Sequence, residues 1–294
     1  MIRRLTDEKL LAYISLILGL LCFAGAEAVI RFSSRIYPDY EILLYRSLFL
    51  LVFVVIVAAT TKKLHHFKTT RLDMHMLRSV FSAGSFLFAI KALTGLKLYS
   101  FKALSFVSPI FIVVLGVLIL KEQISKKYVL AFLICLFGVF IAFEPGSEVL
   151  SSYGFFGICS ALCAALAVLT FKKMAPTETT LAIILYYSLA CIFISFFLID
   201  FSKLTFSLEN MELFALMAFF HLIASFFYTY GLRIHNLTAI SMVNYLALPI
   251  SMALGFALWR EWPATNMLIA GVLITLSNIV LQIKKSHFRI LKRK

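Results

Sequence analysis

Three ionisable side chains lie within long apolar stretches of the 294-residue sequence: Glu27, Arg46 and Lys91. A charged group inside a membrane costs roughly 2.5–3.5 kcal/mol on insertion scales, so each of the three needs a structural or functional reason. If the N-terminus is cytoplasmic, all three fall in the outer halves of the first three predicted spans. We therefore expect them to surround one polar chamber whose mixed charges suit a zwitterion or a carboxylate.

Local pairing is the alternative explanation for two of these charges. Glu27 and Arg31 are spaced i, i+4 in the order that favours an ion pair on a helix, and the amine of Lys91 is able to reach the membrane interface. Glu27 is also a candidate proton carrier, as intramembrane carboxylates often are. Arg46 has a poor local partner in Glu41, so Glu27 on the neighbouring span is the better one.

Other polar and aromatic residues of the predicted spans are further candidates for substrate binding. Aromatic rings that carry hydroxyl groups suit a planar or cationic ligand, although packing of the bundle is the simpler explanation for any one of them. The histidine among them either competes with Glu27 as a proton carrier or is a hydrogen-bonded core residue. These candidates are Tyr186, Tyr187, His221, Tyr230 and Asn244.

Two prolines, Pro109 and Pro249, lie in predicted spans that correspond to one another in the two halves of the chain. Each removes a backbone donor and is expected to bend its helix. Paired interruptions in matching helices point to the central site of a carrier. The alternative is that membrane helices simply tolerate proline where neighbouring groups satisfy the freed carbonyl.

The composition and the apolar stretches predict an all-α integral membrane protein. Hydrophobic residues make up 62% of the chain, whereas soluble domains contain roughly 45–50%. A membrane-spanning helix needs about 20 mainly apolar residues. The ten predicted spans are Leu10–Ile30, Glu41–Thr60, Leu77–Thr94, Ser100–Leu120, Tyr128–Phe143, Tyr153–Phe171, Leu181–Ile199, Glu212–Leu232, Leu237–Trp259 and Thr265–Ile283.

The two halves of the chain are similar to one another. Gly95–Ser105 (GLKLYSFKALS) matches Gly231–Ser241 (GLRIHNLTAIS), and upstream Cys22 aligns with Cys163 at an offset that also aligns Arg46 with Tyr187. An odd-numbered repeat has to insert its second copy upside down, and inverted repeats are typical of alternating-access carriers. We predict a first five-helix repeat at 1–143, an outer linker at 144–152, and a second repeat at 153–294 that ends in a basic cytoplasmic tail.

The net charge of +14 follows from membrane topology. With both termini cytoplasmic, 20 of the 28 Lys and Arg residues fall on or beside inner loops, Arg78 among them. This is the asymmetry that the positive-inside rule requires, so no nucleic-acid partner is expected. A cleavable signal ending at Ala24–Ala28 is the alternative for the first stretch, but its removal would leave the first repeat one helix short.

The sequence lacks the motifs of several enzyme classes. It contains no G-x-x-x-x-G-K-[ST], G-x-S-x-G or H-E-x-x-H motif, and its aspartates lie in loops or at span ends. The five cysteines fall in apolar spans without a C-x-x-C pair, as small buried hydrophobes do. We predict no catalytic residues, no cofactor and no metal site.

These features resemble the drug/metabolite transporter superfamily in its EamA-type ten-helix branch. The resemblance covers nearly the whole chain. It rests on the repeat, on Gly116 and Gly255 before two basic–acidic pairs, and on Tyr40–Arg46 (YEILLYR), which is similar to the arginine-bearing second helix of the family. It implies the fold and transport of small molecules such as amino acids or nucleotide sugars. Glu27 together with YEILLYR is also similar to rickettsial-type S-adenosylmethionine uptake carriers.

The functional prediction is a secondary carrier of a small polar metabolite in the inner or plasma membrane. The expected substrate is amino-acid-like, with S-adenosylmethionine as the specific candidate, and membrane lipid surrounds the protein. A lipid scramblase or a membrane scaffold is the alternative. Oligomeric state, transport direction and coupling ion stay open at this stage.

The predicted topology is testable at the linker between the repeats. A cysteine placed at Ser147 in a Cys-free background should react with a membrane-impermeant thiol reagent added from outside, because the 144–152 segment is acidic and lacks Lys and Arg. Labelling that occurs only after the inner side is opened would overturn the orientation.

Overall fold

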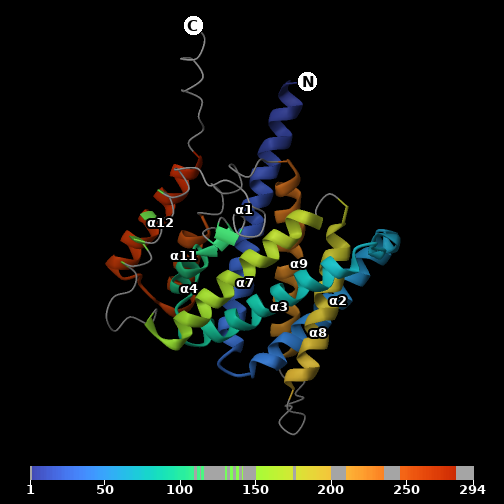
Figure 1. Ribbon diagram of the computed structural model, residues 1–294, viewed down its shortest axis with the longest axis horizontal. Coiled ribbons are helices and arrows are strands. Elements are labelled where there is room, and N and C mark those ends of the chain that lie inside the picture. The colour runs from blue at the N-terminus through green and yellow to red at the C-terminus, as the bar shows by residue number, and fades with distance from the viewer. Residues whose placement is uncertain are drawn as a thin grey trace.

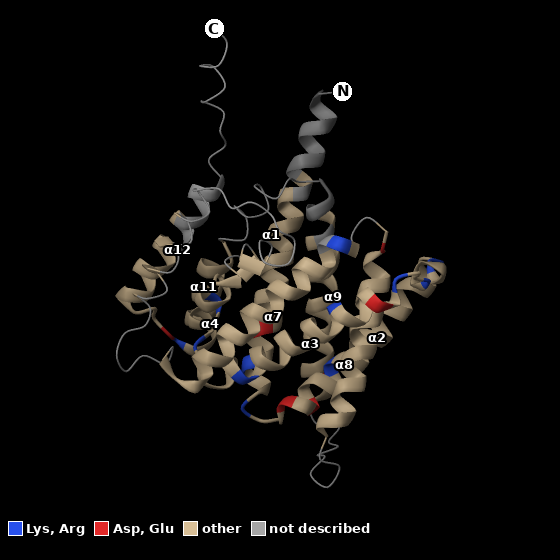
Figure 2. Ribbon diagram, viewed as in Figure 1, with Lys and Arg blue, Asp and Glu red and all other residues tan. Residues whose placement is uncertain are grey.

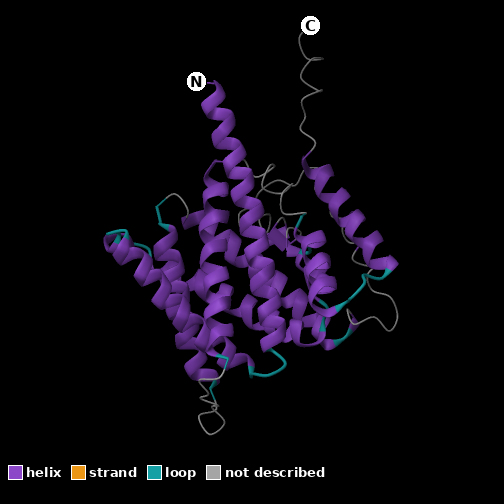
Figure 3. Cartoon of the chain, turned by 180° about the vertical axis from the view of Figure 1, so that it is seen from behind, coloured by secondary structure: helices purple, strands orange, loops and turns teal. Residues whose placement is uncertain are grey.

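The structure is a computed structural model that describes residues 2–108, 150–174, 177–199, 210–234 and 246–282, with isolated positions between 111 and 141. This described part is helical and contains no strand (Figure 3), as predicted. Its elements are α1 (Ile2–Ser33), α2 (Asp39–Thr60), the short 3-10 helix η1 (Leu64–Phe67), α3 (Leu72–Gly95), α4 (Leu98–Ser105), α7 (Ser152–Met174), α8 (Thr180–Leu198), α9 (Met211–Ile234), α11 (Ala247–Trp259) and α12 (Thr265–Gln282).

Six described helices are long and apolar enough to cross a membrane, and they coincide with six of the predicted spans. They comprise Tyr13–Ser33, Asp39–Thr60, Leu72–Gly95, Ser152–Phe171, Thr180–Leu198 and Met211–Tyr228. The protein is therefore a multi-pass membrane protein. The shorter apolar helix α11 covers the second part of the ninth predicted span. The fifth predicted span and most of the fourth lie outside the continuously described residues.

Local sequence sets where two of the central helices begin. Pro38 precedes α2, and Asp39 and Glu41 occupy its first turn, where negative charge complements the helix dipole. Thr179 caps α8, because its side-chain oxygen accepts a hydrogen bond from the backbone N–H of Ala182 at 3.2 Å. These two helices carry Arg46 and Tyr187, so their caps help to set the register of the candidate site.

The helices pack across the two predicted halves rather than only within them. Helix α1 packs along α9, α3 along α7, and α2 against both α8 and α9, while α4 contacts α11 and α7 (Figure 1). The apolar interior includes Leu16, Ile42, Leu93 and Phe214, all at most 1% exposed. The contacts between halves therefore form the centre of the bundle.

The outer surface of the bundle is apolar as well. Phe197 is 76% exposed, and Phe155 and Phe193 are each 63% exposed, which suits contact with lipid chains rather than water. Charged residues of the described helices gather near helix ends, with few along their length (Figure 2). The rare charges in the middle of the bundle therefore need individual explanations.

The last residue of α3, Gly95, packs against the ring of Tyr153 at the start of α7. A Cβ atom at Gly95 would overlap that ring, whereas one at Gly84 on the same helix would meet only Cys163 Sγ at 3.5 Å, an ordinary contact. The first glycine of the repeated GLKLYSFKALS segment is therefore explained by close approach of the two halves.

Replacing Gly95 by alanine should lower the thermal stability of the purified protein in detergent, because overpacking costs about 1–3 kcal/mol. Gly84→Ala is the matched control and should be neutral or slightly stabilising, since alanine favours a helix by up to about 1 kcal/mol over glycine. Equal melting temperatures for the two variants would contradict the proposed contact.

Candidate functional site

Arg46 lies in the centre of the bundle, where α2 meets α8. Its side chain is buried, and Nη1 donates a hydrogen bond to the hydroxyl of Tyr187 at 3.1 Å. The guanidinium carbon lies 3.9 Å from the ring centroid of Phe86 and 5.4 Å from that of Tyr187. Aromatic faces attract a desolvated cation. Nη2 has no hydrogen-bond partner among the described residues, so one donor of the fork is left for another group.

Three further rings extend this environment towards α9 and α1. The ring of His221 stacks on Tyr187 with centroids 5.7 Å apart, and Phe23 meets His221 edge-on, also at 5.7 Å. Tyr228 contacts Phe23 in the same way at 5.9 Å. Arg46, Tyr187 and His221 are thus the three predicted site residues that the structure brings together.

We call Arg46, Tyr187 and His221 the central cluster. Arg78, which the sequence places beside an inner loop, lies in the second turn of α3 and contacts α7. Its guanidinium carbon lies 5.5 Å from the ring centroid of Phe171, and its Nε is shielded from solvent without a hydrogen-bond partner in the described part of the chain.

Glu27 is not the partner of Arg46. Its Oε1 accepts a hydrogen bond from Nζ of Lys102 on α4 at 2.6 Å, and this ion pair is largely buried, with 19% and 13% of the two side chains exposed. Oε2 is shielded and unpartnered within the described residues. The pair is a second polar point in the bundle. Lys102 was not among the predicted site residues, so the sequence did not indicate this pair.

Arg31 likewise has a distant partner rather than the local one. Its two terminal nitrogens donate to the two carboxylate oxygens of Glu261 at 2.8 and 2.6 Å. Its guanidinium carbon also lies 4.4 Å from the ring centroid of Trp259. A bidentate arginine–carboxylate pair is among the strongest polar contacts that proteins make. We call Arg31, Glu261 and Trp259 the outer clasp, because they lie at the end predicted to face outside.

Lys91 is peripheral. Its side chain is 48% exposed, and Nζ lies 3.7 Å from Oδ2 of Asp39, at the start of α2. Nζ also lies 5.4 Å from the ring centroid of Phe156. This geometry matches the interfacial alternative better than a place in a shared polar chamber.

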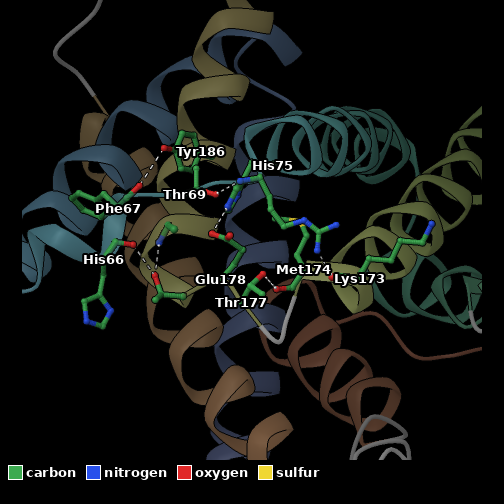
Figure 4. Close-up of polar contacts among 12 residues, drawn as sticks. His66, Phe67, Thr69, His75, Lys173, Met174, Thr177, Glu178 and Tyr186 are labelled. Carbon is green, nitrogen blue, oxygen red and sulfur yellow. Dashed lines mark hydrogen bonds and ion pairs between the residues drawn. The ribbon is translucent and has the colours of Figure 1, made fainter.

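A second buried polar group joins the start of α3 to the segment that precedes α8 (Figure 4). Nε2 of His75 and Oε2 of Glu178 lie 2.9 Å apart with both side chains almost fully buried. The ring of His75 is 4.6 Å from that of Tyr186, whose hydroxyl donates to the carbonyl of Phe67 at 3.1 Å. We call His75, Glu178 and Tyr186 the inner clasp. Tyr186 therefore belongs there and not to the central cluster.

Two backbone contacts reinforce the inner clasp. The hydroxyl of Thr179 donates to the carbonyl of His66 at 3.0 Å, and Nη1 of Arg71 donates to the carbonyl of Lys173 at 2.9 Å. Each joins the η1–α3 region to the connection between α7 and α8. The clasp is therefore a set of contacts between the two predicted halves, as the outer clasp is.

The remaining predicted residues are less central. Tyr230 is 44% exposed near the end of α9. Pro249 stands in the first turn of α11, where backbone N–H groups have no intrahelical partner and proline costs little. Pro109 and Asn244 lie outside the described residues. Within the described residues, no group of three or more His, Cys, Asp or Glu side chains could hold a metal ion.

Residues 10–143 match the model of the EamA-like transporter family. This first part of the chain is thus similar to an EamA-like transporter domain. This match confirms the resemblance to the EamA-type branch that was based on the repeat and on the YEILLYR segment. A solved crystal structure with 17% sequence identity covers 92% of this chain and 96% of its own length with a TM-score of 0.64, so the overall fold has an experimental counterpart.

Three curated relatives carry transport names. The chain is 23% identical over 270 residues to the pseudopaline exporter CntI of Pseudomonas aeruginosa, covering 90% of this chain and 93% of that protein. It is 24% identical to a riboflavin transporter of Brucella anthropi over 70% and 75% of the two chains. It is 21% identical to an S-adenosylmethionine uptake transporter of Rickettsia conorii over 88% and 87%. Exporters and uptake proteins are both represented.

The inner clasp generates a stability prediction. Glu178→Ala would leave Nε2 of His75 buried without its acceptor, which costs about 1–3 kcal/mol. The variant should therefore melt at a clearly lower temperature in detergent. Glu212→Ala, in the exposed first turn of α9, is the control and should behave like the wild type. If the combined variant with His75→Ala shows simply additive losses, the pair does not interact.

Proposed function

We propose that this protein is a secondary transporter of a small polar metabolite that works by alternating access between its two halves. The match to the EamA-like family and the three relatives support transport of a small molecule. The proposal extends to ten helices arranged as two inverted five-helix repeats, with both termini cytoplasmic in the inner membrane. The carrier function itself does not require an enzyme active site, a cofactor or a metal.

The packing of the described helices supports a pseudo-twofold relation between the two halves, which an inverted repeat requires. In the two predicted repeats, α1 is equivalent to α7 and α3 is equivalent to α9. If the halves are exchanged, the contact between α1 and α9 therefore corresponds to the contact between α7 and α3. Both contacts occur and are the most extensive in the bundle. The contacts of α2 with α9 and of α8 with α3 are related in the same way. Such exchange is what a pseudo-twofold axis produces.

The observation that carries the proposal is the contact between Arg46 and Tyr187. The repeat alignment makes these two residues equivalent positions of the two halves, and they hydrogen-bond to one another at 3.1 Å. Two equivalent residues touch only close to the axis that relates them. Carriers with inverted repeats bind substrate at that place, near the middle of the membrane.

The two clasps are the contacts that a carrier would have to open in turn, one at each end of the bundle. The inner clasp joins α3 to the segment before α8, and the outer clasp joins α1 to the residues that follow α11. With both clasps formed, contacts between the halves close the described bundle at each end. Release of one clasp at a time would expose the central cluster to one side only.

The substrate that we propose is amino-acid-like, with S-adenosylmethionine as the specific candidate. Arg46 would bind the carboxylate, since its unpartnered Nη2 and its planar fork suit two carboxylate oxygens. Aromatic faces of Tyr187 and Phe86 would contact the remainder. The name of the Rickettsia relative supports the specific candidate.

Substitution of Arg46 tests the proposed function directly. Arg46→Lys keeps the charge but loses the planar fork, so uptake should fall markedly, and Arg46→Ala should nearly abolish it. Arg35→Lys, on an exposed arginine after α1, should transport normally. The measurement is uptake of radiolabelled amino acids, riboflavin and S-adenosylmethionine into proteoliposomes.

Expression and thermal stability have to be measured on the same preparations, so that loss of transport is separated from loss of folding. Wild-type uptake by both Arg46 variants would exclude Arg46 from the substrate site. Lipid flipping without uptake of any metabolite would favour a scramblase and overturn the carrier proposal.

A further inference from the structure

We propose that a basic surface beside the inner clasp binds the headgroups of anionic phospholipids, and that a bound headgroup links the two halves of the bundle at this end. The surface combines cations from the connection between α2 and α3 with one from the end of α7. We call it the inner basic surface, and it comprises Lys62, Lys63, Lys68, Arg71 and Lys173. The proposal concerns the contact with the membrane and does not depend on the substrate.

The position of the α2–α3 connection sets the depth of four of these cations in the membrane. Helix α2 ends at Thr60 and α3 begins at Leu72, and both helices are long and apolar enough to span a membrane. The short connection of residues 61–71 therefore has to lie at the level of the lipid headgroups. This placement holds whichever side of the membrane the connection faces.

The positive charge of the inner basic surface is not neutralised by the described protein. The four lysines are exposed and Arg71 is partly exposed. None of the five forms an ion pair with an acid of the described residues. The acids that follow closely in the sequence are Asp73, which is exposed, and Glu178, which is held by His75 at 2.9 Å. The net positive charge that remains attracts the phosphates of an anionic membrane surface.

One hydrogen bond brings cations of the two halves together. Nη1 of Arg71 donates to the backbone carbonyl of Lys173 at 2.9 Å, so the first half places a cation beside one of the second half. The side chain of Lys173 points away from the inner clasp and is exposed (Figure 4). A single headgroup that contacts both cations would therefore hold the halves together next to the clasp.

Exposed apolar side chains accompany the cations, which favours a lipid over other anionic partners. Leu64 in η1 is 52% exposed, and Leu72 at the start of α3 is 50% exposed. At the membrane interface such side chains contact acyl chains while neighbouring cations contact phosphates. An acidic protein or a nucleic acid would use only the cations and would leave these leucines unpartnered.

The experiment follows the melting temperature of the purified full-length protein in detergent while phosphatidylglycerol is added. Phosphatidylcholine with the same acyl chains is the probe without net charge, and inorganic phosphate is the probe without acyl chains. The variants are Lys63→Gln combined with Lys68→Gln in the first half, and Lys173→Gln in the second. The matched control combines Arg35→Gln with Arg260→Gln, which removes two exposed cations at the opposite end of the bundle.

Phosphatidylglycerol should stabilise the wild type more than phosphatidylcholine does. This difference should shrink at about 1 M salt, where the Debye length is only about 3 Å. The double lysine variant should need about tenfold more phosphatidylglycerol for the same stabilisation, and Lys173→Gln about fivefold more, because each cation near an anionic surface adds to binding. The control variant should respond like the wild type.

Equal stabilisation of the wild type by the two lipids would overturn the proposal, and so would an undiminished response of the double lysine variant. An equal loss in the control variant would also overturn it, because the response would then follow total charge. A full response of Lys173→Gln would exclude the link between the halves. If inorganic phosphate alone reproduced the whole effect, the surface would bind a free anion and not a lipid. Should the double variant fail to fold, Lys63→Gln and Lys68→Gln made singly decide in the same way.

Discussion

The fold has to accommodate the buried charge of Arg46 in a bundle that is apolar both inside and outside. Arg46 cannot reach water, so its guanidinium is stabilised by the hydroxyl of Tyr187 and by the faces of two rings. Those partners come from α3 and α8, which fixes α2 between them. The caps of α2 and α8 and the close approach at Gly95 are consistent with this one arrangement.

Elsewhere in the bundle, buried charged groups are stabilised by partners of opposite charge. Three other ionisable groups of the interior have partners on distant segments: Arg31 with Glu261, His75 with Glu178, and Lys102 with Glu27. Breaking a buried pair is expensive because one charge is left alone. Arg46 differs, since its guanidinium forms no ion pair with an acid of the described residues. The two ends of the described bundle are thus joined by paired charges, whereas the centre holds a charge that only a hydroxyl and aromatic rings stabilise.

The sequence predicts the helices and the place of Arg46 inside the bundle, but not the pairing of the charges. Six predicted spans were confirmed because length and apolar composition are local properties. The partners of Glu27 and Arg31 were not predictable from spacing, since Lys102 and Glu261 are 75 and 230 positions away. Arg78 satisfies the positive-inside rule as a cation near a span end, and only the fold shows that its guanidinium packs on Phe171.

The proposed inverted repeat has a consequence for how the contact between Arg46 and Tyr187 would behave during transport. A contact between equivalent residues maps onto itself when the two halves exchange roles, so the bond from Arg46 to Tyr187 can persist in both orientations of a carrier. The two clasps map onto different residues, so the proposed exchange of the halves would have to break them in turn. In the proposed carrier, the contact at the axis would serve as the pivot, and one clasp would open at a time. Because Arg46 also has the unpartnered Nη2 donor, substrate binding and the exchange of the halves would then act on the same side chain.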